Sequence, residues 1–182
     1  LSLWKDPIWQ RCPVCEHSGE SLDQSLYLQK LVGIDAAASE FDALPEVFAS
    51  VYEKIRRTLP DKCHFTFHAG EDFSHIISGL RAIYEAIQFL TLNDKDRIGH
   101  AVALGVDYAL WRERIGNQIW IKQGEWFDNL LFIYHLYRED HREIPANIAT
   151  DLNKYFSKVY PRRKLNIDDA VAAWLNGKWN PI

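Results

Sequence analysis

Short apolar segments alternate with longer amphipathic stretches in the first part of the chain. The short segments are 31–35, 64–68 and 97–100, and each ends on an aspartate or a histidine. A short apolar run is typical of a buried strand, whereas apolar residues that recur every three or four positions are typical of a helix. The pattern therefore predicts successive strands joined by helices, the order found in parallel α/β sheets.

Two helices are predicted between these strands. In 45–59 the apolar residues recur every four positions, and Pro45 suits a first helical turn. In 76–90 a similar apolar stripe follows Ser74, a plausible N-cap. Core packing explains such stripes fully, so we expect both helices to cover the strands.

The second half of the chain is predicted to be mainly helical. An aromatic run at 126–137 is followed by helical patterns at 146–160 and 167–175, and Asn176 and Gly177 form a reasonable stop. The first of these runs is aromatic on more than one face. We therefore expect it to be buried against other protein, for which a second subunit is one candidate.

The spacing of the predicted strands is close to that of a barrel. Ile34, His68 and His100 are separated by 34 and 32 positions, and an eight-fold (β/α)8 barrel of about 250 residues has about 31 residues per unit. Chemistry in such barrels sits at the carboxyl ends of the strands. Asp35, His68 and His100 lie at those ends, so the spacing predicts that they converge on one mouth.

The tetrapeptide that begins at His68 suggests metal-assisted hydrolysis. A histidine at a strand end is a ready ligand for a divalent metal, and Glu71, three residues later, can move protons beside it. Neither residue would be persuasive alone. His100, at the end of the next predicted strand, strengthens the interpretation.

Three blocks of sequence resemble the adenosine deaminase family of metal-dependent aminohydrolases. The segment 32–40 resembles the family's strand-four signature, 67–71 its strand-five signature and 97–101 its strand-six signature. The resemblance covers about 31–106. It implies a partial (β/α)8 barrel comprising about strands four to six, with a mainly helical C-terminal extension.

The resemblance also implies roles for individual residues. His68 would be a zinc ligand, and Glu71 would protonate a purine ring nitrogen as hydroxide attacks the carbon that carries the amino group. His100 would orient and stabilise that hydroxide. Zinc supplies such a nucleophile because it lowers the pKa of bound water towards about 7.

Substrate contacts follow from the same blocks. The resemblance places Asp35, Ala38 and Gly70 at the substrate, with the main-chain amide of Ala38 against a purine ring nitrogen. The family normally has glycine at the positions of Ala38 and Ala101, and glycine permits a closer approach. We interpret both alanines as tolerated variations.

The family's remaining zinc ligands are missing from this chain. The family has a His-x-His pair on its first strand and a paired aspartate on its last. No two of the seven histidines are separated by a single residue: His17, His64, His68, His75, His100, His135 and His141. The segments 150–153 and 168–169 are weak candidates for the last-strand motif. A catalytic zinc takes three protein ligands, and the chain contains no methionine, so we expect a fragment of a longer enzyme.

The run 97–107, followed by the helical segment 126–130, is more like the large bacterial adenosine deaminase-like proteins than the compact housekeeping enzymes of the family. The large bacterial group includes the deaminase subunit of an anti-phage adenosine deamination system. The likeness implies ATP or dATP as substrates, assembly into homo-oligomers and an ATPase partner. On this view 1–30 is an extended arm, 31–106 the central portion of the barrel, and 107–182 a helical extension that forms an assembly surface.

Composition and cysteine usage limit the remaining possibilities. The net charge of −4 creates no field for non-specific binding to nucleic acids, and no apolar run approaches the length of a membrane helix. Three cysteines suit a reducing compartment, so the cytoplasm is expected. Cys12 and Cys15 form a C-x-x-C pair that is either an ordinary loop, a redox dithiol or half of a metal site completed by Cys63 and His64.

The working hypothesis is hydrolytic deamination of an adenine nucleoside or nucleotide to the inosine-type product, with Zn²⁺ as cofactor. Two alternatives stay open. One is another zinc amidohydrolase reaction, such as hydrolysis of a cyclic amide, because one barrel mouth can host several chemistries. The other is a non-catalytic assembly module that keeps a degenerate barrel without its metal. The isolated chain can be inactive under any of these hypotheses.

Overall fold

The computed structural model describes residues 31–37, 39–59, 63–116, 118–159 and 166–176. Every described helix and strand belongs to the unit Gly33–Ile182. The predictions for the 1–30 arm, for the Cys12–Cys15 pair and for Ala38 lie outside the described residues.

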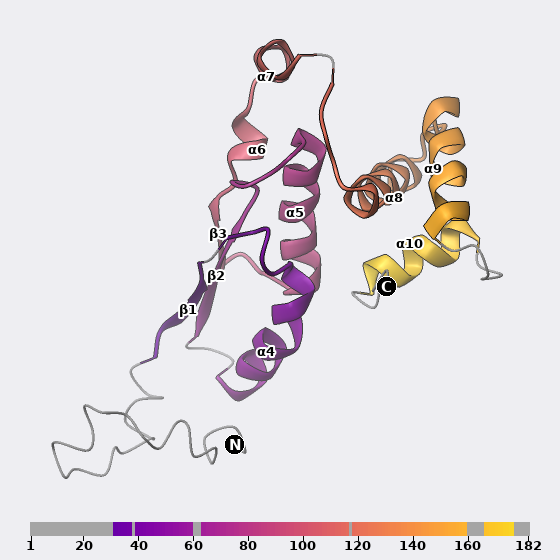
Figure 1. Ribbon diagram of the computed structural model, residues 1–182. Helices are drawn as coiled ribbons and strands as arrows, with labels where there is room; N and C mark the ends of the chain where they lie inside the picture. The colour runs from indigo at the N-terminus through magenta and orange to yellow at the C-terminus, as the bar shows by residue number, and fades with distance from the viewer. Residues whose placement is uncertain (1–30, 38, 60–62, 117, 160–165, 177–182) are drawn as a thin grey trace, which may run out of the picture. The chain divides into compact units, whose positions relative to one another are not determined.

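Three parallel strands form a small sheet in the order β1-β2-β3, with β1 at Gly33–Ala36, β2 at His64–Ala69 and β3 at Arg97–His100 (Figure 1). The alternation of strands and helices predicted from the sequence is therefore confirmed as a mixed α/β arrangement. The predicted first strand is displaced, since pairing begins at Gly33 and not at Leu31. No closed barrel is present in the part of the chain that the structure describes.

Two helices cover one face of this sheet: α4 at Pro45–Thr58 and α5 at Ile76–Phe89 (Figure 1). The side chains of β2 alternate between the two faces, as a strand requires. Phe65, Phe67 and Ala69 are buried under the helices, whereas His64, Thr66 and His68 lie on the opposite face.

Side-chain contacts attach α4 to strand β2 and cap the start of α5. Tyr52 of α4 stacks on Phe65 with a ring-centroid distance of 4.5 Å, and its hydroxyl donates a hydrogen bond to the Thr66 carbonyl. Pro45 stands at the start of α4, as predicted. The predicted N-cap of α5, Ser74, is wrong. His75 is extended there and its Nδ1 accepts a hydrogen bond from the Ile77 amide, which satisfies a first-turn donor.

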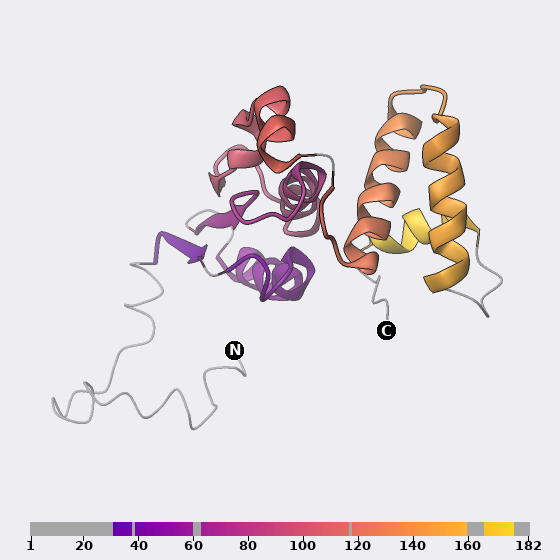
Figure 2. The ribbon, with the colours of Figure 1, turned by 45° about the horizontal axis from the view of Figure 1, so that its top comes forward.

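The rest of the described chain is helical. It consists of α6 at Val102–Gly105, α7 at Tyr108–Ile115, α8 at Gln123–Glu139, α9 at Ala146–Val159 and α10 at Ile167–Leu175. Figure 2 shows α8 and α9 side by side with α10 crossing them. None of these described helices combines the length and the apolar composition that crossing a membrane requires.

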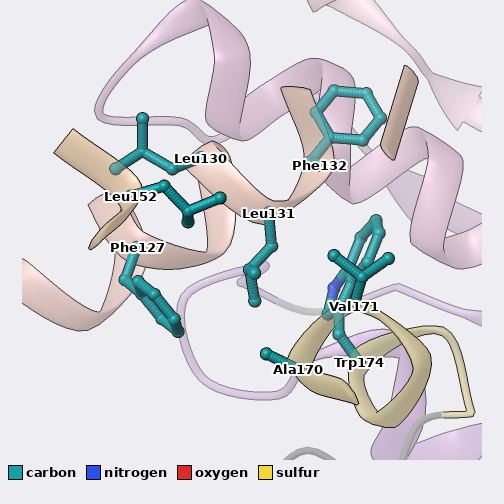
Figure 3. Close-up of a cluster of buried hydrophobic side chains, with 8 residues drawn as sticks. All are labelled: Phe127, Leu130, Leu131, Phe132, Leu152, Ala170, Val171 and Trp174. Carbon is teal, nitrogen blue, oxygen red and sulfur yellow. The ribbon is translucent and has the colours of Figure 1, made fainter. Parts of the chain in front are cut away.

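A hydrophobic core joins α8, α9 and α10 (Figure 3). Its buried side chains come from all three helices: Phe127, Leu130, Leu131, Phe132, Leu152, Ala170, Val171 and Trp174. Ile77, Leu80 and Tyr84 of α5 pack against it. The predicted burial of the aromatic helix is thus confirmed, and residues of the same chain provide the covering surface.

Buried polar side chains link α5 to this helical part. Arg81 donates to Asn129 Oδ1 at 2.9 Å and to Glu85 at 2.6 Å, and the Trp174 indole donates to the same Glu85 oxygen at 2.7 Å. Asn129 in turn donates to Ser78 Oγ at 2.9 Å. Burial lowers the pKa of Arg81, but the carboxylates of Glu85, Asp128 and Glu125 together raise it by more, so the guanidinium keeps its charge. Segments on both sides of residue 106 therefore share one interior.

Candidate active site

The candidate active site lies at the carboxyl ends of the three strands. The ends of parallel strands fall on one edge of a sheet, so residues from different strands meet there. His68 is next to last in β2 and His100 is last in β3. Their imidazole rings are 5.0 Å apart between centroids, in an edge-to-face arrangement of 63°. The structure thus brings together the two histidines that the sequence placed at neighbouring strand ends.

Gly99 makes room for the His68 ring. It is the parallel-strand partner of His68, and a Cβ built at Gly99 would fall among the ring atoms of that imidazole. The ring therefore lies across the main chain of β3, where only glycine leaves space. Gly99 was not among the predicted site residues, although its place just before His100 was visible in the sequence.

Glu71 and His100 form the second pair in the site. His100 Nε2 lies 3.4 Å from Glu71 Oε2, and about half of each side chain is exposed, 48% and 47%. The two groups form an ion pair when the imidazole is protonated. Both also remain accessible to a small molecule that approaches the sheet edge.

The backbone after β3 is left-handed at two successive residues. His100 has φ of 60° and Ala101 has φ of 47°, and this conformation costs a non-glycine residue about 1–2 kcal/mol. Ala101 donates from its amide to the Gly99 carbonyl at 2.7 Å and then caps α6. Glycine would adopt this conformation without strain, whereas the alanine at position 101 holds it at a cost.

Gly70 shapes the turn between His68 and Glu71. Its φ is +77°, and an added Cβ would lie 2.5 Å from the Ile83 side chain, so both conformation and space require glycine. Its carbonyl accepts a hydrogen bond from the Ala103 amide at 2.8 Å, and its amide donates to Glu40 at 2.7 Å. Gly70 therefore has a structural role in the turn. Its contact with substrate stays a prediction.

Glu40 supports this turn and was missed as a site residue. Its carboxylate accepts hydrogen bonds from three successive main-chain amides, those of Gly70 and Glu71 at 2.7 Å each and that of Asp72 at 3.3 Å. Glu40 closes the segment 32–40, which resembles a deaminase signature, but nothing in its local sequence indicates a partner 30 residues away.

A cavity of about 330 Å³ opens beside His68, between β1 and the start of α4. Its lining comes mainly from β1, the following turn and α4: Ile34, Asp35, Ala36, Ala37, Ser39, Glu40, Ala43, Phe48, Val51, Tyr52, Phe67 and His68. Burial, followed by the negative charge of Asp35, raises the pKa of Tyr52 to about 12, so its hydroxyl stays protonated. Asp35 and His68, both predicted site residues, thus face one hollow, which combines apolar walls with a few polar groups as ligand sites do.

The described residues do not complete a zinc site. Among them, no group of three or more histidine, cysteine, aspartate or glutamate side chains is arranged to hold a metal, and a catalytic zinc takes three protein ligands. His68 and His100 bring two imidazoles together at most. Cys63, considered for a metal site with the Cys12–Cys15 pair, is buried in the core.

The two candidates for a last-strand aspartate lie in helices. The segment 150–153 is inside α9. Asp168 and Asp169 begin α10, where Asp169 forms a capping box with Asn166 and Asp168 accepts a hydrogen bond from the Tyr134 hydroxyl. These contacts give both aspartates a structural part at a helix start.

Comparison of the sequence with models of protein families and with curated proteins found no match. The likeness to adenosine deaminases therefore depends on the three sequence blocks and on the way their residues meet at the sheet edge.

Proposed function

We propose that this chain carries the central part of an active site that deaminates an adenine nucleoside or nucleotide by hydrolysis. One observation carries the proposal: His68, Glu71 and His100, from two neighbouring parallel strands and one turn, meet at the carboxyl edge of the sheet. The three strands would then be about strands four to six of a (β/α)8 barrel. In that fold, catalytic residues come from the carboxyl ends of several different strands.

Hydrolytic deamination needs a group that moves protons beside the purine ring. Water adds to the ring carbon that carries the amino group, a ring nitrogen takes up a proton, and ammonia leaves to give the inosine-type product. Glu71 suits the proton transfer because its carboxylate is half exposed at the edge of the site. His100, whose Nε2 lies 3.4 Å from that carboxylate, would orient the attacking water. A positioned acid or base contributes about 10²–10⁴-fold to a rate.

The proposal includes Zn²⁺, for which His68 would be one ligand. Because the described residues gather too few ligands, the others would come from parts of the protein outside them. The cavity beside His68 supports a small substrate, since its volume of about 330 Å³ lies at the lower end of the roughly 300–1,000 Å³ found for ligand pockets. Asp35, Gly70 and Ala38 are the residues proposed to contact that substrate.

Ammonia release from purine compounds tests the proposal. The purified protein, supplied with zinc, is incubated with adenosine, deoxyadenosine, AMP, ATP and dATP. We expect Glu71→Gln to lower turnover at least about 100-fold and to leave the zinc content unchanged, because proton transfer and not metal binding is lost. Glu53→Gln, the same change at an exposed position of α4, is the matched control. Turnover that survives Glu71→Gln would disprove the assignment.

A cyclic-amide hydrolase would show a different substrate profile. Ring opening of a cyclic amide, with no ammonia released from any adenine compound, would favour that alternative. In both cases loss of turnover in Glu71→Gln would keep the residue in its proton-transfer role.

An assembly module without catalysis is the second candidate function. Large apolar side chains exposed on α6, on α7 and just after α7 favour it: Leu104, Tyr108, Leu110 and Trp120. Such a surface suits the proposed homo-oligomer or an ATPase partner. Absence of zinc from a folded, oligomeric protein, measured by metal analysis together with light scattering, would favour the module over the enzyme.

A further inference from the structure

The segments that follow the three strands are connected by hydrogen bonds to the main chain. Glu40, after β1, binds the amides of the turn after β2, which is formed by Gly70, Glu71 and Asp72. The Gly70 carbonyl in turn accepts from the amide of Ala103, after β3, at 2.8 Å. One continuous set of contacts therefore crosses the carboxyl edge of the sheet.

We propose that Glu40 is the positioning residue of this site. Its carboxylate holds the turn from Gly70 to Asp72 and thereby sets where the Glu71 side chain starts relative to His68 and His100. The part that concerns catalysis depends on the proposed function of Glu71. The part that concerns the turn does not, because it follows from hydrogen bonds alone.

The geometry of the turn explains why a carboxylate fits there. The left-handed Gly70 directs successive amide groups towards one point, which forms a concave site that favours negative charge. A carboxylate provides about four lone-pair positions on two oxygens, and Glu40 uses both oxygens for its three bonds. Hydrogen bonds to an ionised acceptor are about twice as strong as neutral ones.

The same contacts separate the roles of the two glutamates. Glu40 already accepts three hydrogen bonds, so its carboxylate is poorly placed to exchange protons with a substrate. Glu71 donates its amide to Glu40, and its half-exposed carboxylate is 3.4 Å from His100. Glu71 therefore carries the proton, and Glu40 fixes the main chain from which Glu71 extends.

Amide hydrogen exchange tests the structural part of the proposal. In Glu40→Gln the side chain keeps its size but loses its charge and one acceptor oxygen. We expect the Gly70, Glu71 and Asp72 amides to exchange at least about tenfold faster, since a hydrogen bond to a charged group contributes about 1.5–3 kcal/mol. Glu40→Asp keeps the charge with a shorter reach, so it should retain part of the protection. Unchanged exchange at all three amides in Glu40→Gln would overturn the proposal.

Asp107→Asn is the matched control. Asp107 also accepts two main-chain amide bonds, from Ala109 at 2.9 Å and from Leu110 at 3.0 Å, at the start of α7. Asparagine keeps the Oδ1 acceptor that both amides use and is an equally good N-cap, so exchange at Ala109 and Leu110 should change little and the turn after β2 should be unaffected. Faster exchange at that turn in the control as well would point to general loosening and count against a specific role of Glu40.

Steady-state kinetics test the catalytic part. A positioning role predicts that Glu40→Gln lowers kcat at least about tenfold while KM changes less than about twofold, with partial recovery in Glu40→Asp. A change in KM alone would instead make Glu40 a substrate contact and contradict the proposal. The two proposals can fail separately. If the Gly70, Glu71 and Asp72 amides exchange faster in Glu40→Gln while Glu71→Gln leaves turnover intact, the deaminase function is refuted and Glu40 keeps its role in shaping the turn. In a protein without turnover, the exchange rates alone decide.

Discussion

Substituting Gly99 by alanine should displace His68 and disable the candidate site. The added methyl group would occupy the space of the His68 imidazole, which lies across β3 at this position. The strand itself can keep its course, because the obstacle is a ring that can rotate about its side-chain bonds. We therefore expect the site to be lost before the fold is lost.

The expected cost in stability is modest. Overpacking a well-packed position costs about 1–3 kcal/mol, and His68 is only half-buried and can swing towards solvent. A loss of about 1–2 kcal/mol in the free energy of unfolding is thus expected. The contact between the rings of His68 and His100, 5.0 Å apart, would be broken. Turnover should fall by more than about tenfold, because a displacement of about 1 Å can cost 10²-fold in rate.

Gly105→Ala supplies the matched control, since nothing lies within 4 Å of a Cβ built at Gly105 in α6. Alanine there should leave stability unchanged or raise it by up to about 1 kcal/mol. Urea unfolding gives the stabilities, and the ring resonances of His68 and His100 report the site by NMR. If Gly99→Ala leaves these resonances and the turnover as they are, our account of how His68 is placed is wrong.

Two further predictions concern buried charges. Asp96→Asn should cost about 2 kcal/mol at pH 7: burial raises the pKa of Asp96, but hydrogen bonds from main-chain amides and Arg56 lower it by more. The ionised form therefore stabilises the fold above pH of about 4, and this contribution is lost as pH falls through the lowered pKa. In urea unfolding measured from pH 7 to pH 3, the free energy of unfolding should fall less steeply with pH in Asp96→Asn than in the unsubstituted protein. An equally steep fall would contradict a stabilising role of ionised Asp96. Glu85→Gln should cost about 3 kcal/mol, because it leaves the buried guanidinium of Arg81 without its closest negative partner and weakens the acceptor for Trp174; a change below about 1 kcal/mol in urea unfolding would refute this.

The sequence by itself predicted three strands, five of the described helices and the strand ends where the candidate chemistry lies, but neither α6 nor α7. The segments 64–68 and 97–100 are strands, as predicted. The helix α4 begins at Pro45, and the helix α10 ends at Leu175, just before Asn176. These features are local: hydrophobic periodicity and capping depend on residues within a few positions of one another. The order of strands and helices followed from the same pattern, and with it the meeting of His68 and His100.

Only the tertiary structure decided which residues support those side chains. Glu40 binds amides 30 to 32 positions away, and Arg81 of α5 reaches Asn129, 48 positions away. Gly99 became recognisable as a site residue only when the strand register placed it beside His68. Such contacts depend on how strands pair and how helices pack, and a one-residue change of register would bring different atoms together. A linear pattern carries no record of that choice, which is why the residues around the site emerged only from the fold.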